Sequence, residues 1–317
     1  MPQQASVASL LPTSCDWCPR KCGANRAAGQ RGVCGAADSL RIARAALHFW
    51  EEPPISGTSG SGTVFFSYCP LRCCYCQNKS IALGDAGADV SLERLADILL
   101  EQQDRGALNV NMVTPTHYGP IIAQAVRMAR SRGLSLPVVW NTAGYENVSS
   151  LAALEHVVDV YLTDFKYASP GPAQDYSNAG DYPQVALAAL DEMVRQAGAP
   201  QFDQVKGQVR LVRGVVVRHL LLPGHLDDSM QVVKLLHERY GKSVLVSLMN
   251  QYTPVLAATD AALAKHPNLG QAPSSEDYEL LLDYADALGM EDYFWQDGQA
   301  SRESFIPAFD LQGVLQA

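Results

Sequence analysis

Three closely spaced cysteines, Cys69, Cys73 and Cys76, follow directly after a run of apolar residues that predicts a β-strand. Their C-x3-C-x2-C spacing allows three thiolates on one tight loop to bind three corners of a cubane [4Fe–4S] cluster. A closed zinc site would need a fourth ligand close by. The fourth iron of the cluster would therefore have no protein ligand and would be free to chelate a substrate's amino and carboxylate groups. We call residues 69–76 the cysteine loop and interpret its extra thiol, Cys74, as a spectator.

A second group of cysteines lies near the start of the chain, at Cys15, Cys18, Cys22 and Cys34. We call residues 15–34 the N-terminal cysteine segment. It is rich in glycine and has too few apolar residues to form a core, so we expect a metal to fold it. Four thiolates suit a closed zinc site or a second [4Fe–4S] cluster, and the sequence leaves both open. All 8 cysteines of the chain fall in these two groups, which favours metal ligands over disulfides.

The composition excludes several classes of protein. The formal charge is -9, from 33 acidic and 24 basic residues, which argues against a dedicated nucleic-acid binder. The first residues lack the basic region and apolar run of a signal peptide, and no stretch approaches the ~20 apolar residues of a membrane helix. We therefore expect a cytoplasmic chain that binds neither nucleic acid nor membranes and whose thiols stay reduced.

Short apolar runs alternate with amphipathic patterns along most of the chain. The predicted strands are residues 63–68, 110–114, 137–141, 157–163, 214–222 and 244–249. The predicted helices are one that Ser91 caps and Gly106 ends, one from Ile121 to Gly133, and residues 183–197, 228–240 and 275–288. Such alternation is typical of parallel βαβ units, in an open sheet or a partial barrel.

From this alternation we predict an α/β fold, a partial (β/α)6 TIM-like barrel with an N-terminal four-cysteine metal-binding segment. Residues 1–60 would form that segment and a linker, and residues 61–317 the barrel with a C-terminal lid. In such folds the chemistry lies at the carboxyl ends of the strands. His117 and His219 stand at or near strand ends, which makes them candidate catalytic residues.

The cysteine loop resembles that of the radical S-adenosylmethionine superfamily, whose C-x3-C-x-aromatic-C motif matches Cys69, Cys73, Tyr75 and Cys76. The resemblance implies that the open iron binds the methionyl end of S-adenosylmethionine and that Tyr75 lies near the adenine. It also implies reductive cleavage to methionine and a 5′-deoxyadenosyl radical, which abstracts a hydrogen atom.

Other segments are similar to the glycyl-radical-enzyme activases, the group of pyruvate formate-lyase activating enzyme. Asp164-Phe165-Lys166 looks like their D-x-K element, residues 141–145 (NTAGY) like their D-T-x-G-aromatic segment, and Arg218 like the arginine of a strand before a Pro-Gly turn. The strings EEPPISG, GSGTVFFS, VTPTHY, TDFKY, RHLLLPG and LMNQY resemble a branch named after these activases.

The resemblance implies roles for individual side chains. Lys166 and Arg218 would pair with the carboxylate of S-adenosylmethionine. Asn141, Thr142 and Asp164 would accept from its amine or ribose, or bind a monovalent cation. Family activases have Gly-Gly-Glu-Pro after the second strand, whereas this chain has residues 113–118 (VTPTHY), so the expected acceptors there are hydroxyls. These belong to Thr114 and Thr116.

The expected function is radical generation that activates a partner protein by forming a glycyl radical, with an electron from a flavodoxin-like or ferredoxin-like donor. One alternative is a radical enzyme that acts on a small molecule or another macromolecule. A third hypothesis is a non-catalytic zinc-binding or scaffold protein, against which the C-x3-C-x2-C spacing argues. No residue identifies the group that loses hydrogen.

Overall fold

The computed structural model describes residues 7–296 and 307–316; part of the expected C-terminal lid, residues 297–306, lies outside this range. The strands are β1 Leu40–His48, β2 Ser61–Phe66, β3 Ala88–Val90, β4 Val110–Val113, β5 Val138–Thr142, β6 Val160–Asp164, β7 Gln201–Val205, β8 Gln208–Leu220, β9 Leu245–Met249 and β10 Tyr293–Trp295. The α-helices are α1 Pro53–Ser56, α2 Lys79–Leu83, α3 Leu92–Asp104, α4 Gly119–Ser131, α5 Val148–Ala152, α6 Pro170–Ser177, α7 Tyr182–Ala197, α8 Leu226–Tyr240, α9 Ala261–Lys265 and α10 Ser275–Ala287. Short 3₁₀ turns cover Val7–Leu10, Arg26–Ala28, Thr116–Tyr118, Gly241–Ser243 and Pro267–Gly270.

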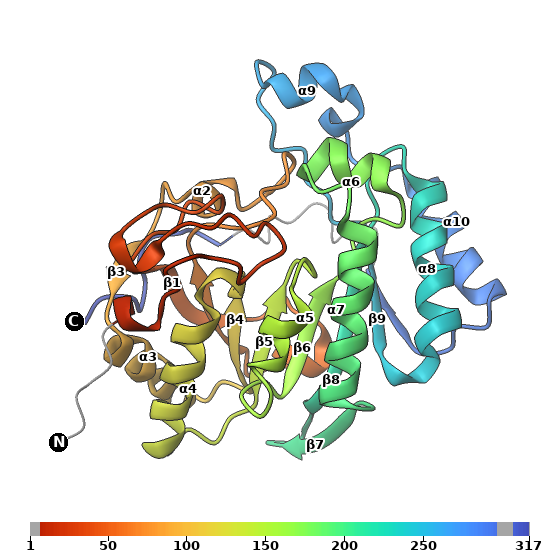
Figure 1. Ribbon diagram of the computed structural model, residues 1–317. Helices are drawn as coiled ribbons and strands as arrows, with labels where there is room; N and C mark the ends of the chain where they lie inside the picture. The colour runs from red at the N-terminus through yellow and green to blue at the C-terminus, as the bar shows by residue number, and fades with distance from the viewer. Residues whose placement is uncertain (1–6, 297–306, 317) are drawn as a thin grey trace.

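The described strands form a sheet in the order β10-β9-β8-β6-β5-β4-β2-β1-β3, with β7 paired to β8 (Figure 1). The six strands predicted from the sequence are β2, β4, β5, β6, β8 and β9, and all of them pair in parallel. The α/β prediction with a parallel sheet is therefore confirmed. Among the described strands the sheet is open, with β3 at one edge and β10 at the other, so closure into a barrel is not seen.

The five predicted helices all form, as α3, α4, α7, α8 and α10. Ser91 caps α3 as expected, because its side-chain oxygen accepts from the backbone N–H of Arg94 at 3.1 Å. No helix in the described residues is long and apolar enough to cross a membrane.

Further strands, beyond the six predicted ones, extend the sheet. β1 pairs antiparallel with β2 and with β3, so the sheet includes residues before position 60. β7 forms an antiparallel hairpin with the start of β8, and its turn residues Lys206 and Gly207 both have positive φ, which suits a tight two-residue turn. β7 carries mostly polar, exposed side chains, so it lacks the apolar pattern that marks the buried strands.

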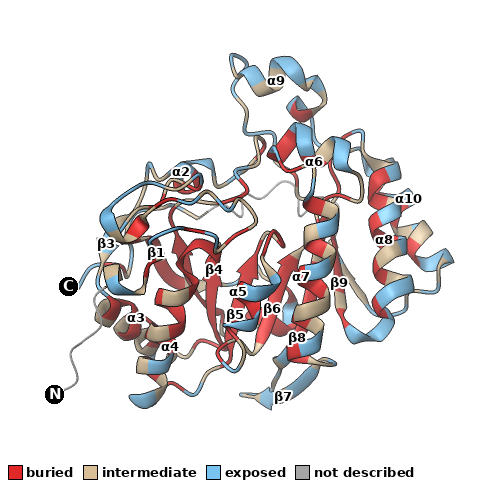
Figure 2. Ribbon diagram, viewed as in Figure 1, coloured by how far each residue is buried: buried red, intermediate tan, exposed pale blue. Residues whose placement is uncertain are grey.

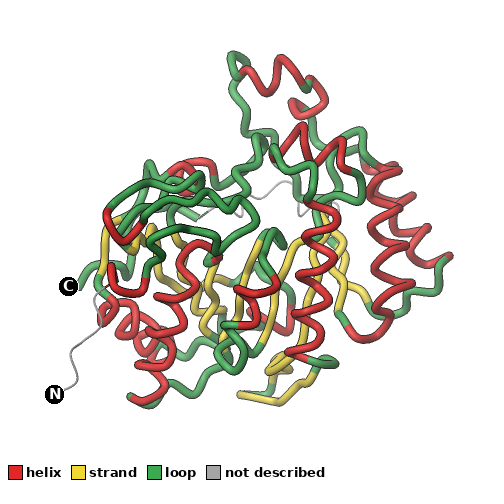
Figure 3. The backbone as a smooth tube through the Cα atoms, viewed as in Figure 1, coloured by secondary structure: helices red, strands yellow, loops and turns green. Residues whose placement is uncertain are grey.

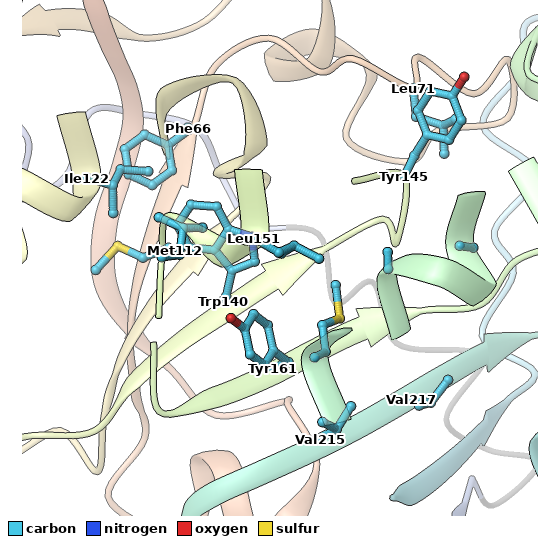
Figure 4. Packing of buried hydrophobic residues seen from close by; sticks show 14 of the residues in the cluster. Phe66, Leu71, Met112, Ile122, Trp140, Tyr145, Leu151, Tyr161, Val215 and Val217 are labelled. Atoms are coloured by element: carbon cyan, nitrogen blue, oxygen red, sulfur yellow. The ribbon is translucent and has the colours of Figure 1, made fainter. Parts of the chain in front are cut away.

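The parallel strands consist mostly of buried residues (Figure 2), because apolar side chains pack against both of their faces, and this explains their nearly continuous apolar sequence. On one face, Met112, Trp140, Tyr161 and Val215 pack in the larger cluster (Figure 4). On the other face a smaller cluster surrounds Ile55 of α1. The polar residues that follow the strands are thus held on a rigid frame.

Candidate active site

A cavity of about 230 Å³ opens at the carboxyl ends of the parallel strands, where the chemistry was predicted. Loops gather at this end of the sheet (Figure 3). The sequence-predicted residues that line the cavity are Cys69, Cys73, Tyr75, Cys76, Thr114, Asn141, Thr142, Asp164, Lys166 and Arg218. The fold therefore brings together side chains that are spread over 150 positions of the sequence, counting from 69 to 218 inclusive.

The cysteine loop presents three free thiols to this cavity. Burial, with repulsion from Cys73, raises the pKa of Cys69 to about 11 and that of Cys76 to about 12, although Lys166 acts to lower both. The donor set is that of an iron–sulfur cluster, which would stabilise these thiols as thiolates. No group of three or more His, Cys, Asp and Glu side chains in the described part of the chain is placed to hold a metal ion. A cluster binds each thiolate through a different iron, and three thiols that line one cavity fit that requirement.

A partly buried network of charges lines the same cavity as the thiols. Arg218 donates from Nε to Asp164 Oδ1 (2.9 Å) and from Nη2 to Asn141 Oδ1 (2.6 Å). Lys166 Nζ donates to Asp164 Oδ2 (2.7 Å). Burial acts to raise the pKa of Asp164, but the charges of Lys166 and Arg218 outweigh it and hold the pKa below its usual value. Lys166 and Arg218 keep further N–H groups for an anionic ligand.

Glu51 belongs to this network, although no motif of the sequence marked it as a site residue. Its Oε2 pairs with Arg218 Nη1 at 3.1 Å, and its Oε1 accepts from Asn111 (3.1 Å) and Asn141 (3.2 Å). Burial raises its pKa, although Arg218 opposes that effect. The signal was in the string EEPPISG, where two adjacent acids precede prolines. The cavity thus has a carboxylate that the VTPTHY segment lacks, supplied by the chain before β2.

The loop after β5 approaches Asp164 closely because residue 144 is a glycine. A Cβ at Gly144 would lie 2.3 Å from the carbonyl oxygen of Asp164, and its φ is positive (77°). The glycine of the NTAGY segment therefore has a packing role beside the site.

The predicted threonines have different positions. Thr114 lines the cavity with a positive φ of 57°, which is uncommon for a residue other than glycine. Thr142 also lines it, but its hydroxyl donates to Glu146 Oε1 at 2.6 Å. Thr116 donates to the same oxygen at 2.7 Å and does not line the cavity.

The two candidate catalytic histidines do not line the cavity either. His117 Nε2 donates to the carbonyl oxygen of Ser67 (2.8 Å), and burial lowers its pKa to about 3. His219 Nδ1 donates to the carbonyl oxygen of Phe165 (2.7 Å), and alternation along β8 places it on the opposite face from Arg218. Both are buried histidines with hydrogen bonds to the backbone.

The N-terminal cysteine segment lies against the loops of the site. Its four thiols are close together: burial and the neighbouring Cys34 and Cys15 raise the pKa of Cys18 to about 12. A Cβ at Gly32 would lie 3.3 Å from the sulfur of Cys22 and 3.4 Å from that of Cys34. Four thiols are a donor set that suits zinc or a second cluster, but in the described residues they do not form a metal-holding group, so both the binding of a metal and its identity stay predictions.

Comparison with known proteins gives two likenesses. The chain is 26% identical over 299 residues to a curated protein of Methanocaldococcus jannaschii described as uncharacterized protein MJ0674, covering 91% of this chain and 79% of the other. Among solved structures it resembles a radical SAM methyltransferase from Sphaerobacter thermophilus, with a TM-score of 0.51 and 16% identity over 75% of this chain and 67% of that chain. No protein-family profile matches the chain. The second likeness shows that the two proteins share a fold.

Proposed function

We propose that this protein is a radical S-adenosylmethionine enzyme. One observation carries the proposal: three thiols in C-x3-C-x2-C spacing and the group formed by Asp164, Lys166 and Arg218 line the same cavity at the carboxyl ends of parallel strands. The shared fold with a radical SAM methyltransferase supports it. The motif and the charged group come from different parts of the sequence, so their meeting in one cavity is independent support.

The residues of the cavity would divide the work between cluster and cofactor. Cys69, Cys73 and Cys76 would hold the [4Fe–4S] cluster, which when bound supplies one electron that splits S-adenosylmethionine into methionine and a 5′-deoxyadenosyl radical. Lys166 and Arg218 have N–H groups left for the cofactor's carboxylate, which would form charge-assisted hydrogen bonds. The carboxylates already paired with them keep these cations charged and in place.

The candidate functions differ in the molecule from which the radical would abstract hydrogen. Activation of a partner protein by glycyl-radical formation is the role implied by the resemblance to the activases, with a flavodoxin-like or ferredoxin-like protein as electron donor. The methyltransferase activity of the solved relative favours the alternative, a radical enzyme that acts on a small molecule or another macromolecule. A zinc-binding scaffold protein without activity is the third candidate.

The test is anaerobic reconstitution with iron and sulfide, followed by reduction with dithionite and assay of 5′-deoxyadenosine and methionine. Wild-type protein should form both products in equal amounts. Cys69→Ala should form neither, whereas Cys74→Ala, a change in the same loop, should keep the activity. Wild-type protein that holds iron but forms no 5′-deoxyadenosine over hours would refute the proposal, and a colourless, iron-free preparation would favour the scaffold hypothesis. Transfer of the radical to a glycyl-radical enzyme, detected by EPR, would then separate the two enzymatic candidates.

A further inference from the structure

A chain of three hydroxyl groups leads from the cavity to the sulfur of Cys73. Tyr75 and Tyr167 bring their hydroxyl oxygens to 2.9 Å, and Tyr167 and Ser177 bring theirs to 2.7 Å. Ser177 Oγ donates to Cys73 Sγ at 3.1 Å. The chain joins the cysteine loop to the loop that follows β6 and to the last residue of α6.

Each hydroxyl has one proton, so the direction of the whole chain is fixed. Because Ser177 uses its proton on Cys73, its oxygen must accept from Tyr167. Tyr167 has then used its proton, so its oxygen accepts from Tyr75. All three O–H dipoles therefore point toward the sulfur of Cys73.

Burial of the three hydroxyl groups strengthens the effect of their aligned O–H dipoles on the sulfur of Cys73. Tyr75, Tyr167 and Ser177 are 7%, 1% and 2% exposed, so water does not screen the chain. In a low-dielectric interior hydrogen bonds are stronger, and bonds in series polarise one another. Ser177 is also held from outside, because Arg20 Nη2 donates to its carbonyl oxygen at 2.8 Å.

We infer that Ser177, polarised by Tyr167 and Tyr75, sets the reduction potential of the cluster that Cys73 would bind. The inference rests on the proposed function, since it assumes a cluster at the cysteine loop. Hydrogen bonds to cluster sulfurs are one of the means by which a protein sets a cluster's potential. Reduction increases the electron density on sulfur, so a donor to Cys73 stabilises the reduced state and raises the potential. Ser177 acts through Cys73 and is a positioning residue.

The test is an anaerobic redox titration of the reconstituted protein, with the reduced cluster monitored by EPR. The signal to monitor is the one that Cys69→Ala abolishes. Ser177→Ala should move the midpoint potential to a more negative value. A tenfold fall in the equilibrium constant for one-electron reduction, about 59 mV, is the expected size. Tyr167→Phe, which keeps Ser177 but removes its polarising partner, should cause a smaller shift in the same direction.

Ser61→Ala is the matched control. Ser61 is equally buried and has one side-chain hydrogen bond, to Asn109 (2.6 Å), at the opposite end of β2 from the cysteine loop. Its potential should equal that of the wild type. If Ser177→Ala takes up no iron, Tyr167→Phe decides. If Ser177→Ala holds a full cluster whose potential is unchanged, this inference alone is overturned. The same result in Tyr167→Phe overturns it where that variant decides. Absence of iron from wild-type protein overturns the proposed function and this inference together.

Discussion

Arg20 donates from Nε to the carbonyl oxygen of Pro70 at 2.9 Å, across 50 positions of sequence. The same guanidinium donates to the carbonyl oxygens of Leu71 (3.2 Å), Ser177 and Asn178 and lies over the ring of Tyr145. Arg20 stands between Cys18 and Cys22, so one side chain of the N-terminal cysteine segment fixes both the cysteine loop and the end of α6. The planar, five-donor fork of arginine suits this task, whereas lysine offers a single point of charge.

Arg20→Ala should make the cysteine loop lose its cluster faster. Two of the lost hydrogen bonds, those to Pro70 and Leu71, hold the cysteine loop; at about 0.5 kcal/mol each they contribute about 1 kcal/mol, which corresponds to roughly a 5-fold faster local opening. The measurement is the rate at which a chelator removes iron from the anaerobically reconstituted protein. Arg213→Ala is the control, because Arg213 also binds backbone carbonyls, those of Gln196 and Ala197. Equal rates for the two variants would contradict the role given to Arg20.

Glu51→Gln should weaken the binding of S-adenosylmethionine about tenfold. The amide loses the charge that pairs with Arg218, and its single acceptor oxygen cannot replace both Oε2, which accepts from Arg218, and Oε1, which accepts from the asparagines, so Arg218 and Asn141 are held less firmly. The measurement is equilibrium binding to the reconstituted protein by calorimetry.

Glu101→Gln is the matched control for this prediction. Glu101 also pairs with an arginine, Arg94, and neither residue lines the cavity. Its affinity should stay within about twofold of the wild type, which is within ~0.5 kcal/mol. Wild-type affinity in Glu51→Gln would show that Glu51 has no part in holding the cofactor's partners.

Much of the fold could be predicted, because its parallel strands are apolar on both faces and its long helices have clear apolar stripes. β7 was missed since its side chains are polar and exposed, and β1 since it precedes the βα alternation. The site was predicted as far as its residues stand at strand ends or in the cysteine loop. Glu51 comes from a connection before β2, and only the folded chain places it beside Arg218. Ser177 also lies outside every motif, and no periodicity of the sequence could predict that its hydroxyl donates to the sulfur of Cys73.

The N-terminal cysteine segment should bind a metal without the cysteine loop. A variant with alanine at Cys69, Cys73 and Cys76 leaves the four N-terminal thiols intact, and metal analysis should still find zinc or iron in it. Zinc would be silent in visible absorption, whereas a second cluster would leave about four irons per chain. Complete loss of metal from this variant would contradict an independent site.

Replacing Cys18 and Cys22 by alanine should lower the metal content and make residues 15–34 more sensitive to proteolysis. Because Arg20 lies between the two cysteines and holds the cysteine loop, we also expect faster loss of iron from that loop. Some formation of 5′-deoxyadenosine should survive, since the three thiols of the loop are unchanged. Undiminished metal content in this double variant would show that these thiols are not ligands.

His117 should make the protein less stable as the pH falls below 6.5. Burial, with the nearby charge of Arg26, lowers its pKa in the folded state from 6.5 to about 3, so the folded protein favours the neutral ring and the unfolded chain binds the proton first. The stabilisation is fully present above pH 6.5 and is lost as the pH falls from 6.5 toward about 3, at up to about 1.4 kcal/mol per pH unit.

His117→Gln retains an amide N–H for the carbonyl oxygen of Ser67 but has no proton to gain. Urea unfolding of the two proteins between pH 7 and about pH 4.5 isolates this contribution, because the other titrating groups are common to both. As the pH falls, the wild type should lose more unfolding free energy than His117→Gln. An equal loss in the two proteins would mean that folding does not lower the pKa of His117, because the ring takes up a proton in the folded state or reaches water.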